Sequence, residues 1–121
     1  DVAYALKNRI KFFAMQNASG VFATPGLRGI VAAAATITKV PTGNEMHIVN
    51  PPKGDKLAYP ICTFTYVILP TKSAKAALLR KFVFYAMSPN QGQKLGPKLL
   101  FAPIPTPVLV AAEKTLQKVQ S

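Results

Sequence analysis

The residues of this chain that could carry out acid–base or metal chemistry are few and scattered. His47 is the only histidine, so the sequence offers neither a histidine dyad nor a multi-histidine zinc site. Cys62 lies in a β-branched and aromatic run, which predicts a small core residue rather than a reactive thiolate. No metal-ligand spacing occurs among the four acids, which are Asp1, Glu45, Asp55 and Glu113. We therefore expect no catalytic residue, no metal site and no cofactor, and we predict that the chain is not an enzyme.

Anion-binding and nucleic-acid-binding motifs are also missing from the sequence. Residues 92–96, GQKLG, lack both the spacing and the preceding strand of a phosphate loop. Fifteen Lys and Arg against four Asp and Glu give a formal net charge of +11, which raises nucleic acid or an acidic membrane surface as a partner. However, no basic run exceeds the pair Arg80-Lys81, and no nucleic-acid signature is present. A basic surface that binds no nucleic acid is the simpler interpretation.

The first half of the chain predicts short elements and one long loop. Residues 1–10 are expected to form the end of a strand and one helical turn, residues 11–16 a buried strand, and residues 17–20 a turn. Thr24 and Pro25 have the types of an N-cap and a first helical residue, so a helix is predicted from there to about residue 37. Residues 40–59 are rich in Pro, Gly and polar residues and predict a long loop, with room for one short strand at the apolar patch of residues 46–49. The apolar side of the helix is expected to carry Leu27, Ile30, Val31, Ala34 and Ile37.

The second half predicts a strand followed by helices. Residues 61–69 are β-branched or aromatic, with apolar groups on both faces, which is typical of a strand covered on both sides. Ser73 is expected to cap a helix over residues 74–87, and residues 91–95 to continue helically until Gly96-Pro97 stops them. Residues 101–105 read as extended, and a last helix follows Thr106-Pro107. In the first of these helices, a packed stripe of Leu78, Phe82 and Tyr85 is predicted, reinforced by Leu79, Val83 and Ala86. In the last helix the packed side chains are predicted to be Val108, Ala112, Leu116 or Thr115, and Val119.

Several strings of the chain are distinctive: AYAL at residues 3–6 with the turn at 16–20, YPICTFTYVILP at 59–70, GQKLGPKLLFAPIP at 92–105 and VLVAAEKTLQKV at 108–119. These strings are similar to those of phosphate-specific solute-binding proteins that feed ABC transporters. They are collinear over almost the whole chain. At Cys62 the chain differs from the family's string, in which Ser or Thr is more usual at this position.

The resemblance implies an α/β fold: part of a two-lobed periplasmic-binding-protein fold, with a mixed sheet flanked by helices that is incomplete on its own. Residues 1–121 would be a carboxy-terminal segment, with 1–57 ending the second lobe and 58–121 returning to the first. Phosphate would be held between the lobes and passed to an ABC permease. The protein would be exported to the periplasm or the cell exterior by a signal outside this chain.

The family's phosphate-binding motifs do not occur in this sequence and would lie upstream of Asp1. We therefore expect no ligand-binding residue on this chain, which would supply scaffold. The missing segment or a second copy would then cover its open sheet edges. Two alternatives stay open: a basic, non-catalytic binding or adhesion module on the same scaffold, and a nucleic-acid-binding domain.

Overall fold

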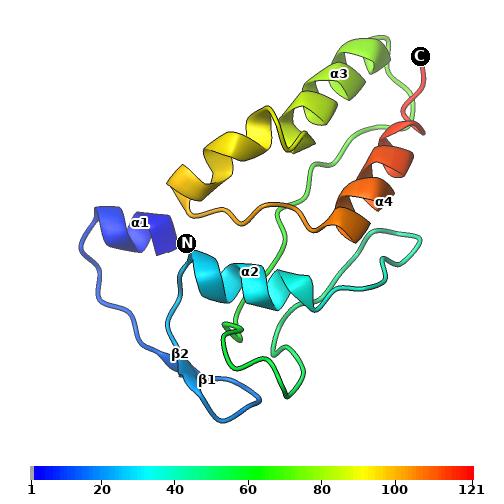
Figure 1. Cartoon of the computed structure of the whole chain (residues 1–121). Helices are drawn as coiled ribbons and strands as arrows, with labels where there is room; N and C mark the ends of the chain where they lie inside the picture. The colour runs from blue at the N-terminus through cyan, green and yellow to red at the C-terminus, as the bar shows by residue number, and fades with distance from the viewer. Residues whose placement is uncertain (1) are drawn as a thin grey trace.

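The computed structural model describes residues 2–121, which form helices at one end and a hairpin with loops at the other (Figure 1). In chain order the elements are α1 (Val2–Lys7), β1 (Met15–Gln16), β2 (Phe22–Ala23), α2 (Leu27–Ala35), α3 (Ala76–Met87), η1 (Gly92–Leu99) and α4 (Thr106–Leu116). Helices α3 and α4 and the 3-10 helix η1 make the first group, and α1, α2 and the hairpin lie below it. The segment that follows residue 60 runs between the two groups to the start of α3.

The amino-terminal region is more helical and more exposed than its sequence predicts. Residues 2–7 form a helix instead of a strand end, whereas Asp1 lies outside the described residues. The predicted buried strand at 11–16 is wrong: only Met15 and Gln16 are paired, and Phe13 is 83% exposed. The pairing is a hairpin with β2, so no second layer covers this apolar run. The predicted turn at 17–20 is confirmed, with Gly20 at a φ of 78° and its N–H bound to the Asn17 carbonyl at 2.9 Å.

The predicted helix after residue 24 is confirmed as α2, but its start and its packed face differ. The helix begins at Leu27, and Gly26 takes the N-cap position without a side-chain bond, so Thr24 is not the cap. The buried positions are Gly29, Ala33 and Ala34, whereas Val31 is exposed. The smallest side chains face inward because the loop approaches the helix backbone closely: the Tyr59 N–H donates to the Gly29 carbonyl at 3.1 Å.

The long loop predicted at residues 40–59 is confirmed and supplies part of the core. Its apolar patch does not form a strand, but Met46 and Ile48 are buried. Ala33, Ile48, Ala58 and Cys62 form one buried cluster, and partly buried residues surround it: Ile30, Ala32, Ile37, Tyr59 and Phe64. The lower half of the molecule is therefore held by a helix packed against loop residues rather than against a sheet.

The strand predicted at residues 61–69 is not formed. The segment is extended in the sense that it has no helix or turn, but it pairs with no other strand among residues 2–121. A strand needs a neighbour to bond its N–H and C=O groups, and the described chain brings none alongside. The β-branched composition favours a strand, but residues 2–121 supply no second strand for it to pair with.

Helix α3 is confirmed, but its predicted apolar stripe faces solvent. Ser73 acts near its start, where the Ser73 hydroxyl accepts from the Lys75 N–H at 3.1 Å, although the helix itself begins at Ala76. The buried residues are Ala76 and Val83. Val83 is buried as predicted. The stripe itself is wrong as an inner face, because α4 packs on the opposite side and leaves three large side chains exposed: Leu78, Phe82 and Tyr85.

Helix η1 extends beyond the predicted stop. Gly96 and Pro97 lie inside it, and it ends at Leu99 with Leu100 in the left-handed conformation. Residues 101–105 are extended as predicted, and the Gln93 side-chain oxygen accepts from the Ile104 N–H at 2.9 Å.

Helix α4 and the carboxy terminus close the upper group of helices. Thr106 is already helical and Pro105 is the N-cap, one residue earlier than predicted. Val108, Leu116 and Val119 are buried as expected. Of the two alternatives left open for one packed position, Leu116 is the buried residue and Thr115 is only partly buried. Beyond α4 the chain returns to the start of α3, where the Ser73 N–H donates to the Gln120 carbonyl at 2.8 Å.

The fold class is α/β in a reduced form: helices with a single two-stranded sheet among residues 2–121. The larger mixed sheet expected from the family resemblance is not formed by these residues.

Candidate functional site

An apolar groove of about 800 Å³ lies on one side of the described structure. It lies where the helices α3 and α4 meet residues 64–69 and the loop residues 43–46. Its walls include Met46, Phe64, Val83, Leu116 and Val119. Because most lining residues are apolar, the groove suits aliphatic or aromatic side chains and not a free anion.

Two side-chain contacts fix the shape of this groove. The Tyr66 hydroxyl accepts from the Met46 N–H at 3.0 Å and donates to the Met46 carbonyl at 3.2 Å. The Asn44 side-chain amide donates to the Thr115 hydroxyl at 2.7 Å. These bonds tie the loop to the extended segment on one side and to α4 on the other. Sequence reasoning did not predict either contact, because each joins residues far apart in the chain.

A smaller hollow of about 450 Å³ lies at the start of α2. Phe22, Thr24, Gly26 and Leu57 contribute to its lining, and the cations Arg28 and Lys56 lie at its edge and are both exposed. No buried polar side chain among residues 2–121 is left without a partner to point into it. The place is electropositive, but it holds no convergent set of donors for phosphate.

Of the described residues considered for chemistry, His47 and Glu45 lie close to each other at the surface. The His47 side chain is 81% exposed, and its Nε2 lies 3.7 Å from Glu45 Oε1. Asp55 accepts the Leu57 and Ala58 N–H groups and so shapes its own loop. Within residues 2–121, no group of three or more His, Cys, Asp or Glu could hold a metal ion.

Cys62 is a buried free thiol, as the sequence predicts. Its Sγ lies 3.3 Å from the Tyr59 carbonyl and donates to it. Burial raises the pKa of the Cys62 thiol, because a thiolate there would lose its hydration. The group is therefore neutral and unreactive at physiological pH, which fits a packing role.

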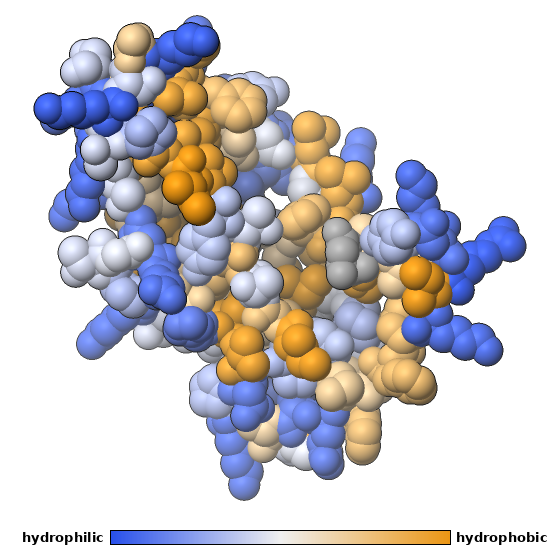
Figure 2. Space-filling view, turned by 180° about the vertical axis from the view of Figure 1, so that it is seen from behind, coloured by the Kyte–Doolittle hydropathy of each residue, from blue (hydrophilic) through white to orange (hydrophobic). Residues whose placement is uncertain are grey.

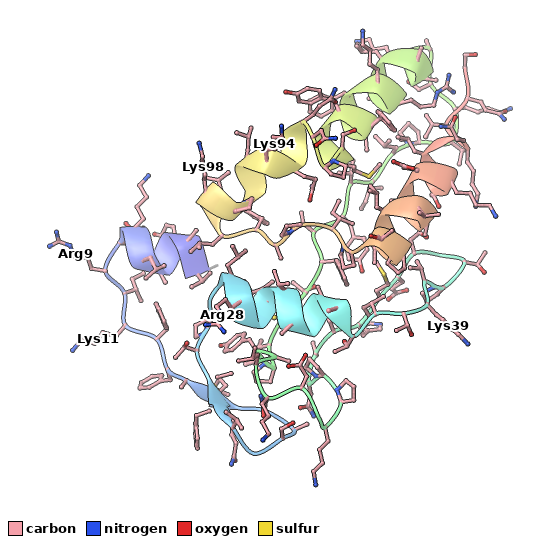
Figure 3. The ribbon with its side chains drawn as sticks, in the orientation of Figure 1. Arg9, Lys11, Arg28, Lys39, Lys94 and Lys98 are labelled. Carbon is pink, nitrogen blue, oxygen red and sulfur yellow. The ribbon has the colours of Figure 1, made fainter. Side chains whose placement is uncertain are left out.

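The basic residues form no single patch in the described structure. Figure 3 labels six of them, which come from several parts of the chain, with Lys94 and Lys98 both on η1. The six, Arg9, Lys11, Arg28, Lys39, Lys94 and Lys98, project away from the ribbon. No Lys or Arg of residues 2–121 lies within 4.0 Å of a carboxylate in that range. The surface is thus strongly cationic without being organised into a groove. No helix of the described part of the chain has the length and apolarity needed to cross a bilayer.

These observations describe a segment with an open apolar groove and scattered cations. Comparisons with known proteins show which proteins its sequence is similar to. The chain is 34% identical over 107 residues to the phosphate-binding protein PstS of Xylella fastidiosa strain 9a5c, covering 87% of this chain and 29% of that protein. It is 30% identical over 107 residues to the PstS of strain Temecula1, with the same coverage. The PstS of Pasteurella multocida strain Pm70 is 25% identical over the whole chain, which covers 33% of that protein.

The predicted resemblance to phosphate-binding proteins is therefore confirmed at the level of sequence. The chain spans about a third of the length of the curated relatives that it matches. No protein-family model matches it.

Proposed function

We propose that this chain is the carboxy-terminal part of a substrate-binding protein that captures inorganic phosphate for an ABC permease. The observation that carries the proposal is its sequence similarity, over 87% of its length, to relatives named as phosphate-binding proteins. The chain supplies scaffold, and the residues that hold phosphate lie in the remaining part of the protein. The role is binding and not catalysis.

The geometry of the described residues supports a scaffold role. The main groove is apolar, and the cationic hollow at α2 lacks buried donors. Capture of a dehydrated oxyanion needs several fixed N–H, hydroxyl or guanidinium donors around one point. Such donors would come from the other lobe segments of a complete protein.

In the complete protein, we propose, residues 1–57 end the second lobe and residues 58–121 return to the first. Phosphate would bind in the cleft between lobes that close by hinge motion. The protein would be exported, since a permease collects its ligand from the outer side of the membrane.

Titration calorimetry with inorganic phosphate tests this function. The complete product of the gene should bind phosphate, while the isolated 121-residue chain should not. Sulfate serves as a matched oxyanion control and should bind much more weakly to the complete protein. If the complete product shows no heat with phosphate, the transport function is wrong and a basic binding or adhesion module becomes the better interpretation.

The nucleic-acid alternative predicts a different result. A chain that neutralises several phosphates of DNA loses affinity steeply with salt, by about a thousandfold or more between 50 and 200 mM for six contacts. Tight, sequence-dependent binding of the 121-residue chain to duplex DNA would favour that alternative. We expect only weak binding that does not depend on the DNA sequence, because the cations are scattered.

A further inference from the structure

Residues 6–13, with the sequence LKNRIKFF, form one continuous exposed run, which we name the aromatic–basic segment. All eight residues are exposed, and among the apolar ones Ile10 is 50% and Phe13 83% exposed. No Asp or Glu occurs anywhere in residues 2–44, so no acidic side chain lies near the segment in sequence. The cations of the segment stand at alternate positions: Lys7, Arg9 and Lys11.

The backbone gives the aromatic–basic segment a defined shape. Helix α1 ends in a two-bond cap, in which the Ile10 N–H donates to the Ala5 carbonyl at 2.8 Å. The second bond runs from the Arg9 N–H to the Leu6 carbonyl at 3.2 Å. Arg9 has a φ of 56°, in the left-handed region, so the chain turns out of the helix at this residue. Figure 3 shows Arg9 and Lys11 projecting away from the ribbon beyond α1. The apolar and charged side chains therefore share one bend of the chain.

The aromatic–basic segment offers no hollow for a discrete ligand. Neither the apolar groove nor the smaller hollow at α2 is lined by any residue of 6–13. Figure 2 views the molecule from behind, which brings α1 to the right-hand edge, and there hydrophilic side chains project with apolar ones between them. A projecting run of large apolar side chains and cations suits a broad partner that is both negatively charged and partly apolar.

We propose that residues 6–13 bind the surface of an anionic lipid bilayer. Leu6, Ile10 and Phe13 enter the boundary between head groups and acyl chains, while the cations of the segment contact the anionic head groups. Charge complementarity selects this occupant, because no Lys or Arg of residues 2–121 lies within 4.0 Å of a carboxylate in that range. Anionic lipids neutralise these cations, and the bilayer removes the exposed apolar side chains from water.

Nucleic acid and a second copy of the chain fit the segment less well. The phosphates of DNA would neutralise the cations but leave Leu6 and Ile10 in water, because aliphatic side chains do not stack on bases as aromatic ones do. A second copy would bring its own formal net charge of +11 against the first, and like charges repel.

Cosedimentation of the complete product of the gene with lipid vesicles tests the inference. Vesicles of phosphatidylcholine with about a third phosphatidylglycerol should bind the protein at least about tenfold more tightly than vesicles of phosphatidylcholine alone. Added salt should weaken this binding, because it screens exposed charges. Absence of binding, or equal binding to the two kinds of vesicle, would overturn the inference. Binding of residues 6–13 to duplex DNA without binding to vesicles would overturn it as well.

Two triple variants of the complete product separate the segment from net charge. Replacing all three cations of the segment with Gln should lower the partition constant on anionic vesicles by about a hundredfold, because each cation near such a surface contributes about fivefold. The matched control removes three exposed cations elsewhere and should lower the constant by less than about tenfold. Equal losses would overturn the inference. The control variant is Lys39→Gln, Lys53→Gln and Lys114→Gln.

A tryptophan reporter tests whether the apolar side chains enter the bilayer. The 121 residues contain no Trp, so Phe13→Trp adds a new signal, measured as the difference from the unsubstituted complete product. Its fluorescence should shift to shorter wavelength on anionic vesicles and be quenched by brominated acyl chains. Val49→Trp, at a position that is 63% exposed, is the matched control and should not be quenched. Equal quenching of the two variants, or an unquenched Phe13→Trp, would overturn the inference.

The inference goes beyond the proposed function and does not depend on phosphate capture. Vesicle binding by a protein that gives no heat with phosphate would retain the bilayer contact and reject the transport function. Heat with phosphate and no vesicle binding would do the reverse.

Discussion

The Asn17 side-chain amide donates to the Ala58 carbonyl at 3.1 Å and thereby joins the hairpin turn to the end of the long loop, 41 residues further on. Asn17 is 6% exposed. Its amide also approaches the Asp55 and Lys56 carbonyls, and its oxygen accepts from the Ser19 and Val21 N–H groups. The single buried side chain of Asn17 therefore hydrogen-bonds both the hairpin turn and the long loop, and it holds the two together without a sheet between them.

Replacing Asn17 should reveal how much this junction stabilises the chain. Asn17→Asp keeps the shape and the accepted bonds but removes the donor, and it places a charge beside carbonyl oxygens. We expect the free energy of unfolding to fall by about 2–4 kcal/mol. Urea unfolding measures the change, with Asn90→Asp, at an exposed position, as control. A loss as small as that of the control would mean that the junction is open in solution.

The glycine after α3 should tolerate no side chain. A Cβ at Gly92 would lie 2.6 Å from the Ala86 backbone, which cannot move aside without disturbing the end of the helix. Gly92→Ala should therefore cost about 1–3 kcal/mol of stability. Gly43→Ala is the matched control, because open space surrounds that position and the smaller entropy of the unfolded chain should leave stability equal or slightly higher. Thermal unfolding of both variants checks the difference, and equal midpoints would contradict the close approach.

The Arg80 guanidinium should hold the carboxy terminus against α3. Its Nη1 donates to the Val119 carbonyl, next to the bridge between Lys72 and Gln120. Arg80→Met keeps most of the apolar stem and loses the charged donor, so we expect a loss of about 1–2 kcal/mol. The neighbouring exposed Lys81→Met serves as control and should change stability little. Faster hydrogen exchange at the Gln120 amide in the Arg80 variant alone would localise the effect, and its absence would argue against it.

Cys62 predicts a defined dependence of stability on pH. Its pKa in the folded chain lies above that in the unfolded chain, because burial disfavours the thiolate. Between those two pKa values the unfolded chain has released a proton that the folded chain retains, so stability falls as pH rises above the ordinary thiol pKa of about 8.5. Below that value the contribution is constant. Urea unfolding from pH 7 to 10 should show this fall relative to Cys62→Ser, and parallel curves for the two proteins would contradict it.

The sequence predicted the helices better than the strands, for a physical reason. A helix bonds its backbone within one segment, so the composition and flanking residues of α2, α3 and α4 are enough to indicate that they form. A strand depends on a partner elsewhere. Residues 61–69 predicted a strand from their side chains alone, and no described segment lies beside them to complete it.

The faces of the helices were predicted less well than the helices themselves. In α2 the inner face carries Gly29 and Ala33 because a loop lies close to the backbone, which periodicity of large side chains does not reveal. In α3 the apolar stripe of Leu78, Phe82 and Tyr85 is exposed, because periodicity shows that a helix has an apolar face but not which neighbour will cover it. The groove and its two fixing contacts, made by Tyr66 and Asn44, depend on pairs of residues far apart in the chain.

The sequence by itself determined the absence of a histidine dyad, the basic charge, the positions of three helices and the resemblance to phosphate-binding proteins. These follow from residue types and short-range order. Only the tertiary structure decided that Asn17 is buried, that Phe82 is exposed, and that residues 61–69 find no pairing partner among residues 2–121. The reason is that burial and strand pairing are relations between distant segments, and a linear pattern gives the preference of each segment without its neighbour.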